Sequence, residues 1–206
     1  MNLPFSASAD RNKSAIGDAL MQYFADATTV IEIGSGSGQH AVYLSERFAH
    51  LDWQPTDQEE YLPGIQQTVS HYARPNIRPP QLLNVARCAS GTEKYSFAYS
   101  ANTAHIMSEK EVAAMFLVLS SRLTIGSCFA LYGPFKFNGA QVSRSNAEFD
   151  SMLRQQSGDM GIRDKITLDE FAASAGFDFV EAIDMPSNNH VLVWRYSGSG
   201  ETRTTI

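Results

Sequence analysis

The sequence predicts an α/β fold in one domain, built on a doubly wound sheet of seven strands. Three observations predict it: strand-like and helix-like segments alternate, a glycine-rich turn joins the first strand to a helix, and two strand-like segments stand together near the end. A length of 206 residues fits one such domain with a sizeable core. We expect this domain to cover residues 1–196 and residues 197–206 to form a flexible tail.

The elements follow from short buried-strand patterns and from apolar residues at helical spacing. Strands are expected at residues 29–33, 51–54, 81–85, 95–100, 127–132, 177–184 and 190–196. Helices are expected from near Asp10, its N-cap, and over residues 38–48, 61–72, 109–122, 146–156 and 167–175. Gly126 is expected to end the fourth of these helical regions, and residues 133–144 to form a long polar loop.

The composition of the chain limits the kinds of partner that the protein is expected to bind. The formal net charge is −6 and lysines and arginines are not clustered, whereas a nucleic-acid binder usually presents a basic face. We find no apolar stretch that approaches the roughly 20 residues needed to cross a bilayer, and the first residues lack the pattern of a secretory signal. We therefore expect a cytoplasmic protein that acts on a small molecule, without nucleic acid or membrane, and leave its oligomeric state open.

Cysteine and histidine usage argues against a metal. With only Cys88 and Cys128, a disulfide framework and a cysteine-rich zinc site are excluded. The histidines His50, His71 and His190 make no ligand pattern with acids or cysteines at useful spacing. We predict a reduced protein with no metal.

The most informative segment is the glycine turn after the first strand, Glu32-Ile-Gly34-Ser-Gly36-Ser-Gly38. Glycines let such a turn tighten and let the backbone approach a ligand at the carboxyl ends of the strands. A dinucleotide site usually reads Gly-x-Gly-x-x-Gly, but here Gln39 stands at the third glycine position. The acidic Glu32 suits the cationic centres of S-adenosylmethionine (SAM). The turn therefore favours SAM, with a dinucleotide site or a purely structural turn as alternatives.

Polar residues at the next strand exits extend this expectation. Asp57 follows the second strand, where a carboxylate can accept hydrogen bonds from both ribose hydroxyls; the alternative is a helix cap. Asn84, at the end of the third strand, is a candidate for the adenine amino group. Arg11 is a candidate for the SAM carboxylate if its segment folds over the pocket, or else an exposed helix residue. The full set expected to contact the cofactor is Arg11, Asn12, Glu32, Gly34, Ser35, Gly36, Gly38, His40, Asp57, Gln58, Asn84, Val85 and Asn102.

Taken together, these residues resemble a small class I methyltransferase-like family long catalogued as a domain of unknown function. The matching stretches are residues 9–13, 32–40, 53–57, 102–105, 132–139, 145–150, 161–164 and 184–189. The resemblance implies the class I SAM-methyltransferase sheet, with the last strand antiparallel beside the fifth, and it implies SAM binding without naming a substrate. The chain has Asn84-Val85 where the family has Asp-Val, which affects the adenine contact more than the fold.

Methyl transfer is an in-line displacement that needs proximity and alignment above all, and a general base helps without always being necessary. Asn102 and His105 follow the fourth strand, where an amide could orient a substrate and an imidazole could take a proton. Tyr132, at the end of the fifth strand, could shape the substrate pocket. We take these three as the catalytic candidates; the alternatives are a packing or capping role for His105 and a structural role for Tyr132.

For other polar residues the sequence allows either a functional or a purely structural role. Lys136, Asn138 and Asn146 lie where a lid is expected, or in a solvated loop. The charged residues Arg154, Arg163 and Asp164 form either a buried network or a site for an anionic substrate.

The leading hypothesis is a SAM-dependent methyltransferase acting on a small molecule. A SAM-binding protein without catalysis is the alternative, and an NAD-dependent oxidoreductase is less favoured.

Overall fold

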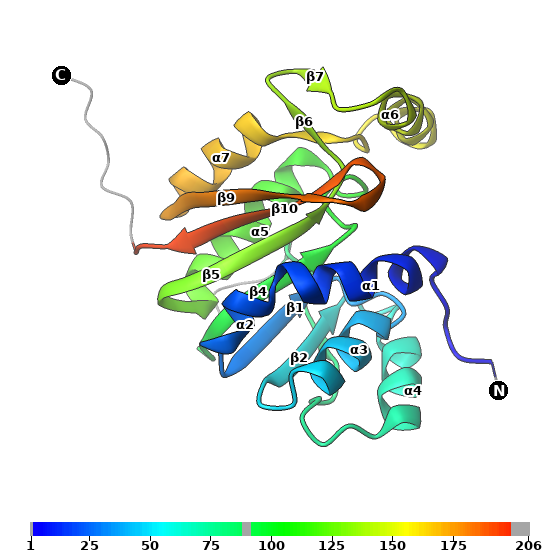
Figure 1. Cartoon of the computed structure of the whole chain (residues 1–206), viewed down its shortest axis with the longest axis vertical. Helices are drawn as coiled ribbons and strands as arrows, with labels where there is room; N and C mark the ends of the chain where they lie inside the picture. The colour runs from blue at the N-terminus through cyan, green and yellow to red at the C-terminus, as the bar shows by residue number, and fades with distance from the viewer. Residues whose placement is uncertain (1, 88–91, 199–206) are drawn as a thin grey trace. The chain divides into compact units, whose positions relative to one another are not determined.

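The computed structural model describes residues 2–87 and 92–198, and its elements alternate as the sequence predicts (Figure 1). The strands are β1 (Thr29–Ile33), β2 (Asp52–Asp57), β3 (Gln81–Leu82), β4 (Tyr95–Ala101), β5 (Leu123–Gly133), β6 (Phe135–Phe137), β7 (Ala140–Gln141), β8 (Arg163–Asp164), β9 (Phe177–Met185) and β10 (Asn189–Tyr196). The helices are α1 (Ala7–Ala19), α2 (Met21–Ala25), α3 (Gln39–Arg47), α4 (Leu62–Tyr72), α5 (Glu109–Arg122), α6 (Arg144–Gln156) and α7 (Lys165–Ser174).

Seven strands form one mixed sheet in the order β3-β2-β1-β4-β5-β10-β9. The strand β1 runs parallel to β2 and β4, whereas β10 runs antiparallel to both β5 and β9. The predicted fold class is confirmed, including the last strand that lies antiparallel beside the fifth. Within this α/β domain the chain clusters into two compact units: the first runs to Asn84 and adds β4, and the second holds Val85–Lys94 and the chain from Asn102 on.

The first unit contains β1 to β4 with α1 to α4, and α3 and α4 lie beside β2 (Figure 1). Its core is aromatic: the ring of Phe24 lies 5.0 Å from that of Phe97, 4.9 Å from Phe48 and 5.8 Å from Trp53, all in edge-on geometry. Such pairs are favourable beyond their buried area. This packing fixes α2 against the strands whose carboxyl ends carry the predicted cofactor residues.

The start of α1 differs from the prediction. The helix begins at Ala7, because the Ser6 hydroxyl accepts a hydrogen bond from the Ala9 amide at 3.2 Å and makes Ser6 the N-cap. Asp10 lies inside the first turn, where its carboxylate pairs with Lys13 at 2.5 Å. Asp10 as N-cap was therefore wrong.

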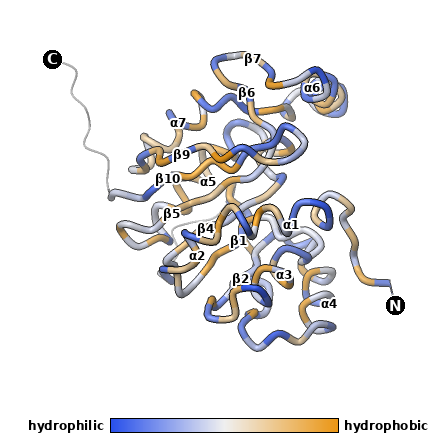
Figure 2. The backbone as a smooth tube through the Cα atoms, viewed as in Figure 1, coloured by the Kyte–Doolittle hydropathy of each residue, from blue (hydrophilic) through white to orange (hydrophobic). Residues whose placement is uncertain are grey.

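The second unit contains β5 to β10 with α5 to α7. Four residues of β10, Val191 to Trp194, are fully buried, and part of β10 is coloured as hydrophobic in Figure 2. Phe116 of α5 packs edge-on against Phe129 at 5.4 Å and Trp194 at 5.3 Å between ring centroids. Helix α5 has the predicted bounds, but Gly126 does not end it: Leu123 already starts β5, and Gly126 lies inside that strand with φ +91°.

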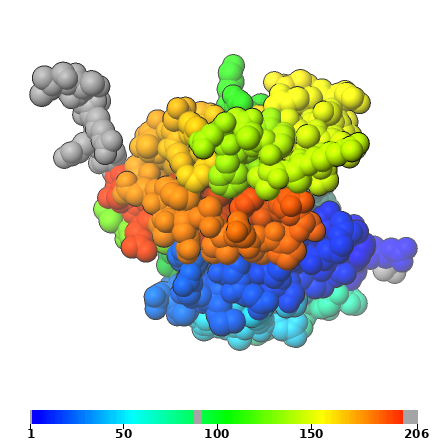
Figure 3. All heavy atoms as spheres, turned by 45° about the horizontal axis from the view of Figure 1, so that its top comes forward, coloured from blue at the N-terminus to red at the C-terminus, as the bar shows by residue number. Residues whose placement is uncertain are grey.

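Residues 133–144 are not the predicted polar loop. They hold β6 and β7, an antiparallel hairpin in which Asn138 and Gly139 form the turn with φ 55° and 79°. Both angles are positive, as a two-residue type I′ turn requires. The hairpin also pairs with β8, and β7 lies against α6; hairpin and helix appear in yellow-green and yellow in Figure 3.

Two predictions fall partly or wholly outside the described residues. Cys88 and positions 199–206 of the tail are among those the structure does not describe. Cys128 is a buried free cysteine. In the described part of the chain no helix is long and apolar enough to cross a membrane.

Candidate functional site

The glycine turn after β1 is built from three residues in the left-handed region, with φ of 72° at Gly34, 57° at Gly36 and 75° at Gly38. The amides of Gly34 and Ser35 each donate to the Thr56 carbonyl at 3.0 Å, which ties the turn to β2. A Cβ at Gly38 would lie 3.3 Å from Cβ of Thr68, so this glycine permits close packing on α4. A Cβ at Gly36 would meet nothing within 4 Å. Gly36 therefore faces open space.

Asp57, the last residue of β2, binds the turn at Gly36, the glycine that faces open space. One carboxylate oxygen accepts the Gly36 amide at 2.7 Å, and the other accepts the Gln58 amide at 2.8 Å. Burial raises the pKa of Asp57, against the effect of these two amides. The N-cap of α4 is Tyr61, so Asp57 is not a helix cap. Each carboxylate oxygen keeps a lone pair for a further donor, such as a hydroxyl.

Glu32 lies beneath the turn. Its side chain is 1% exposed and accepts the Trp53 indole N–H at 2.9 Å. Burial raises the pKa of Glu32 to about 7, against the hydrogen bonds from Trp53 and Ser35. The Thr56 hydroxyl donates to the Glu32 carbonyl at 2.6 Å. Glu32 thus stabilises the turn from the buried side. It would affect a ligand only by holding the turn in place.

The segment before β1 joins α3 beside the turn. Asn12 Oδ1 lies 2.7 Å from Nε2 of His40, which is buried. Burial lowers the pKa of His40 to about 4, so the ring is neutral at pH 7. Arg11 is exposed and its guanidinium contacts the Ser8 hydroxyl. Of the two predicted residues, Asn12 contacts α3 and Arg11 contacts its own helix.

Asn84 and Val85 follow β3, the strand that pairs with the end of β2. The Leu83 amide donates to the Asp57 carbonyl at 2.8 Å, which places Asn84 next to this strand end. Asn84 is half-buried, and Val85 is buried in the second unit. The first unit thus brings together the glycine turn, Asp57, Gln58 and Asn84 at neighbouring strand exits.

The three catalytic candidates lie together in the second unit. Asn102 has φ 59° and its amide donates to the Tyr132 carbonyl at 2.9 Å. His105 is 8% exposed, its ring lies 5.3 Å from that of Phe149, and its Nδ1 is 3.9 Å from where a Cβ of Gly133 would lie. Burial, and then the charge of Arg163, lowers the pKa of His105 to about 4. Tyr132 is 4% exposed.

His105 is not a helix cap. Ser108 caps α5 through a capping box with Glu111, whose carboxylate accepts the Ser108 amide at 2.7 Å. The remaining alternative for His105, packing, agrees with its burial against Phe149.

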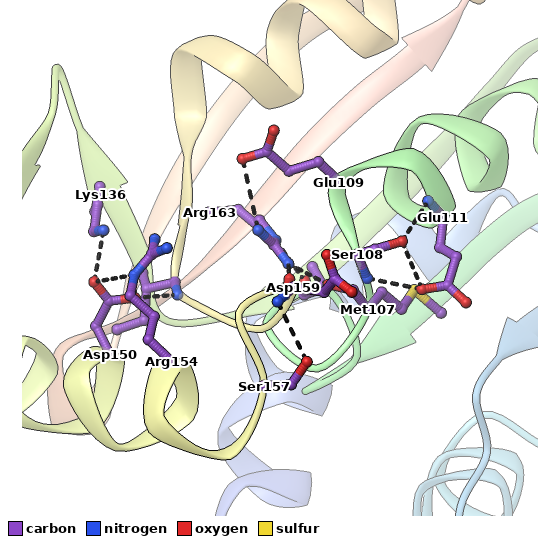
Figure 4. Close-up of polar contacts among 12 residues, drawn as sticks. Met107, Ser108, Glu109, Glu111, Lys136, Asp150, Arg154, Ser157, Asp159 and Arg163 are labelled. Atoms are coloured by element: carbon purple, nitrogen blue, oxygen red, sulfur yellow. Dashed lines mark hydrogen bonds and ion pairs between the residues drawn. The ribbon is translucent and has the colours of Figure 1, made fainter.

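Several charged residues of this unit form ion pairs or hydrogen bonds. Asp150 accepts Lys136 at 2.7 Å and the Ile162 amide at 2.7 Å, with Arg154 3.4 Å away (Figure 4). Asp164 caps α7 by accepting the Ile166 amide at 3.0 Å. Arg154 thus pairs with Asp150, Arg163 with Glu109 at 3.6 Å, and Asp164 with the start of α7.

Two of these arrangements escaped the sequence reasoning. Asp150 joins β6 to α6 and the chain after it, and Asn146 donates to the Asn188 carbonyl at 3.0 Å, far along the chain. Neither contact could be predicted from a local sequence pattern. Within residues 2–87 and 92–198, no three His, Cys, Asp or Glu side chains are placed to hold a metal ion.

A family model described as a protein of unknown function, DUF938, matches residues 3–196. The chain belongs to the DUF938 family. This confirms the resemblance seen in the sequence. The match covers both compact units, so the glycine turn and the His105 region are both part of the DUF938 sequence.

Solved methyltransferase structures share the fold of this DUF938 chain. The mitomycin 7-O-methyltransferase MmcR has a TM-score of 0.78 at 12% identity, over 92% of this chain and 55% of its own. Human N-acetylserotonin methyltransferase in complex with SAM has 0.76 at 13%, over 94% and 53%. An O-methyltransferase family protein from Burkholderia thailandensis has 0.74 at 15%, over 93% and 61%. The chain thus spans between about half and three fifths of these proteins, and at such identities the likeness shows the fold.

Proposed function

We propose that this DUF938 protein is a SAM-dependent methyltransferase that acts on a small molecule. The observation that carries the proposal is the link between Asp57 and Gly36. A buried carboxylate at the end of β2 holds a glycine turn whose middle glycine faces open space. The shared fold with methyltransferases supports the same conclusion.

The residues present fit SAM. Gly36 leaves room for close approach, Asp57 has lone pairs for two ribose hydroxyls, and Asn84 stands at the next strand exit for the adenine amino group. When bound, SAM supplies a methyl group on a cationic sulfonium. The carboxylate of Asp57 stays fixed by two backbone amides, so it accepts the ribose without reorganising. Glu32 and the Asn12–His40 pair hold the turn and α3 in place.

On the acceptor side we propose roles for Asn102, His105 and Tyr132, which follow β4 and end β5. With its pKa lowered to about 4, His105 is neutral at pH 7 and a weak base. It would orient the acceptor by a hydrogen bond more than it would remove a proton. Two of the structural neighbours are named as O-methyltransferases, and this supports an oxygen acceptor.

The weak basicity of His105 also favours the second candidate, a SAM-binding protein without catalysis. The two are separated by incubating the full chain with SAM labelled in its methyl group and a pool of hydroxylated small molecules. Label in an extracted product, reduced at least tenfold in Asp57→Ala, supports the enzyme. SAM binding with no labelled product in any pool would favour the non-catalytic protein.

A further inference from the structure

The loop of residues 102–107, between β4 and α5, is held by a short segment far along the chain. Its carbonyls accept hydrogen bonds from residues 161–163: the Gly161 amide donates to the His105 carbonyl at 2.9 Å, and Arg163 Nε donates to the Ala104 carbonyl at 3.0 Å. The Nη2 group of Arg163 donates to the carbonyls of Met107 and Asp159 (Figure 4). One guanidinium thus binds both sides of His105.

The nearest acceptors of the Arg163 guanidinium are backbone carbonyls, and its ion pair with a carboxylate is longer. Its side chain is 5% exposed, and Glu109, 65% exposed, lies 3.6 Å away. A buried cation costs free energy unless its donors are satisfied. Here carbonyl oxygens satisfy them, and the rigid fork of arginine suits several acceptors at once.

The clamping segment is itself fixed. Gly161 has φ +154°, and a Cβ there would lie 2.9 Å from Asp150 Oδ1 and 2.9 Å from Arg154 Nη2. Asp150 also accepts the Ile162 amide. The segment cannot shift without disturbing α6. The backbone position of Arg163 is therefore set by these contacts and does not depend on its hydrogen bonds to the loop.

We propose that Arg163 is the positioning residue of the acceptor side, because its guanidinium fixes the loop that carries His105 and so fixes where the imidazole points. This rests on the proposed function, in which His105 orients the acceptor. The elements packed against the ring bring Phe149 from α6 and Gly133 from β5, both uncharged, and Arg163 from β8. The same guanidinium therefore also opposes protonation of His105, which lowers its pKa.

The test uses the full chain without cofactor, labelled in its histidines. In Arg163→Met the midpoint of the His105 titration should rise, because a positive charge is removed. In Arg163→Lys the charge stays, so the midpoint should stay nearer the wild-type value, while exchange of the Asn102 and Met107 amides should accelerate at least tenfold. The amides of Gly34 and Ser35, in the first unit, report whether the chain remains folded.

Arg154→Met is the matched control, since it removes an arginine charge that is paired with Asp150, whereas the donors to the carbonyls of residues 104, 105 and 107 are Gly161 and Arg163. It should change neither the titration nor the exchange. Wild-type exchange of the loop amides in Arg163→Lys would overturn the proposal, even if Arg163→Met failed to fold. So would a His105 midpoint in folded Arg163→Met that equals that of Arg154→Met. Both readouts are independent of SAM binding, so failure of the proposed function would be seen separately.

Discussion

Replacing Gly36 by alanine tests whether the open side of the glycine turn receives a ligand. A Cβ at Gly36 meets no atom within 4 Å, so the expected cost to the folded protein is backbone strain at φ 57°, roughly 1–2 kcal/mol. This strain is present with and without ligand and cancels in the dissociation constant. If SAM lies against the turn, the added methyl group occupies its space, and affinity should fall at least about tenfold, or about 1.4 kcal/mol.

Gly139→Ala is a closely matched control. Gly139 also has a positive φ, 79°, a Cβ there also meets nothing within 4 Å, and its amide also donates to an aspartate, Asp164. Both variants should lose similar stability in denaturant unfolding, but Gly139→Ala should bind SAM within about twofold of wild type in calorimetry. Equal SAM affinity in the two variants would refute the reasoning, because the open space at Gly36 would then not be where the cofactor approaches.

Two further predictions concern the parts that support the turn. The pKa of Glu32 is raised from 4.5 to about 7, so its stabilising contribution is complete below pH 4.5 and is lost as the pH rises to 7. Relative to Glu32→Gln, which keeps an acceptor for Trp53, the wild type should lose up to about 3 kcal/mol of unfolding free energy across that range; parallel pH profiles would contradict this. Asn12→Ala removes the hydrogen-bond partner of Nε2 in the buried His40 and should lower the unfolding free energy by roughly 1–3 kcal/mol. Arg11→Ala, at an exposed neighbour, should change it by less than about 0.5 kcal/mol, and equal losses would argue against the Asn12 contact.

The sequence predicts an element well where its signals are local. Helix α5 has its predicted bounds because Ser108 and Glu111 form a capping box at its start. The β6–β7 hairpin was missed although Asn138-Gly139, a strong signal for a two-residue turn, stands at its centre, because the flanking strands are too short to show alternation. The N-cap of α1 is Ser6 and not the predicted Asp10, because serine and aspartate are both residue types that cap helices.

In the candidate site, too, the features with local signals were predicted and the contacts between distant segments were not. The position of Asp57 follows from its place at the end of the second strand, and the glycine pattern places Gly36 at the exit of β1. The bond between them, across 21 positions, appears only when β1 and β2 lie side by side. The burial of Glu32 under Trp53 and the reach of Arg163 to the His105 loop likewise depend on tertiary packing, which no spacing in the sequence encodes.

The central claim is tested most directly by calorimetry of SAM and S-adenosylhomocysteine with the full chain, beside Asp57→Ala and Asp52→Ala. Asp52 starts the same strand and pairs with Arg78 at 2.6 Å, so it controls for loss of a carboxylate from β2. The account predicts that the wild type and Asp52→Ala bind both ligands, and that Asp57→Ala loses roughly 1–3 kcal/mol of binding free energy. A folded wild-type protein that binds neither ligand would contradict it.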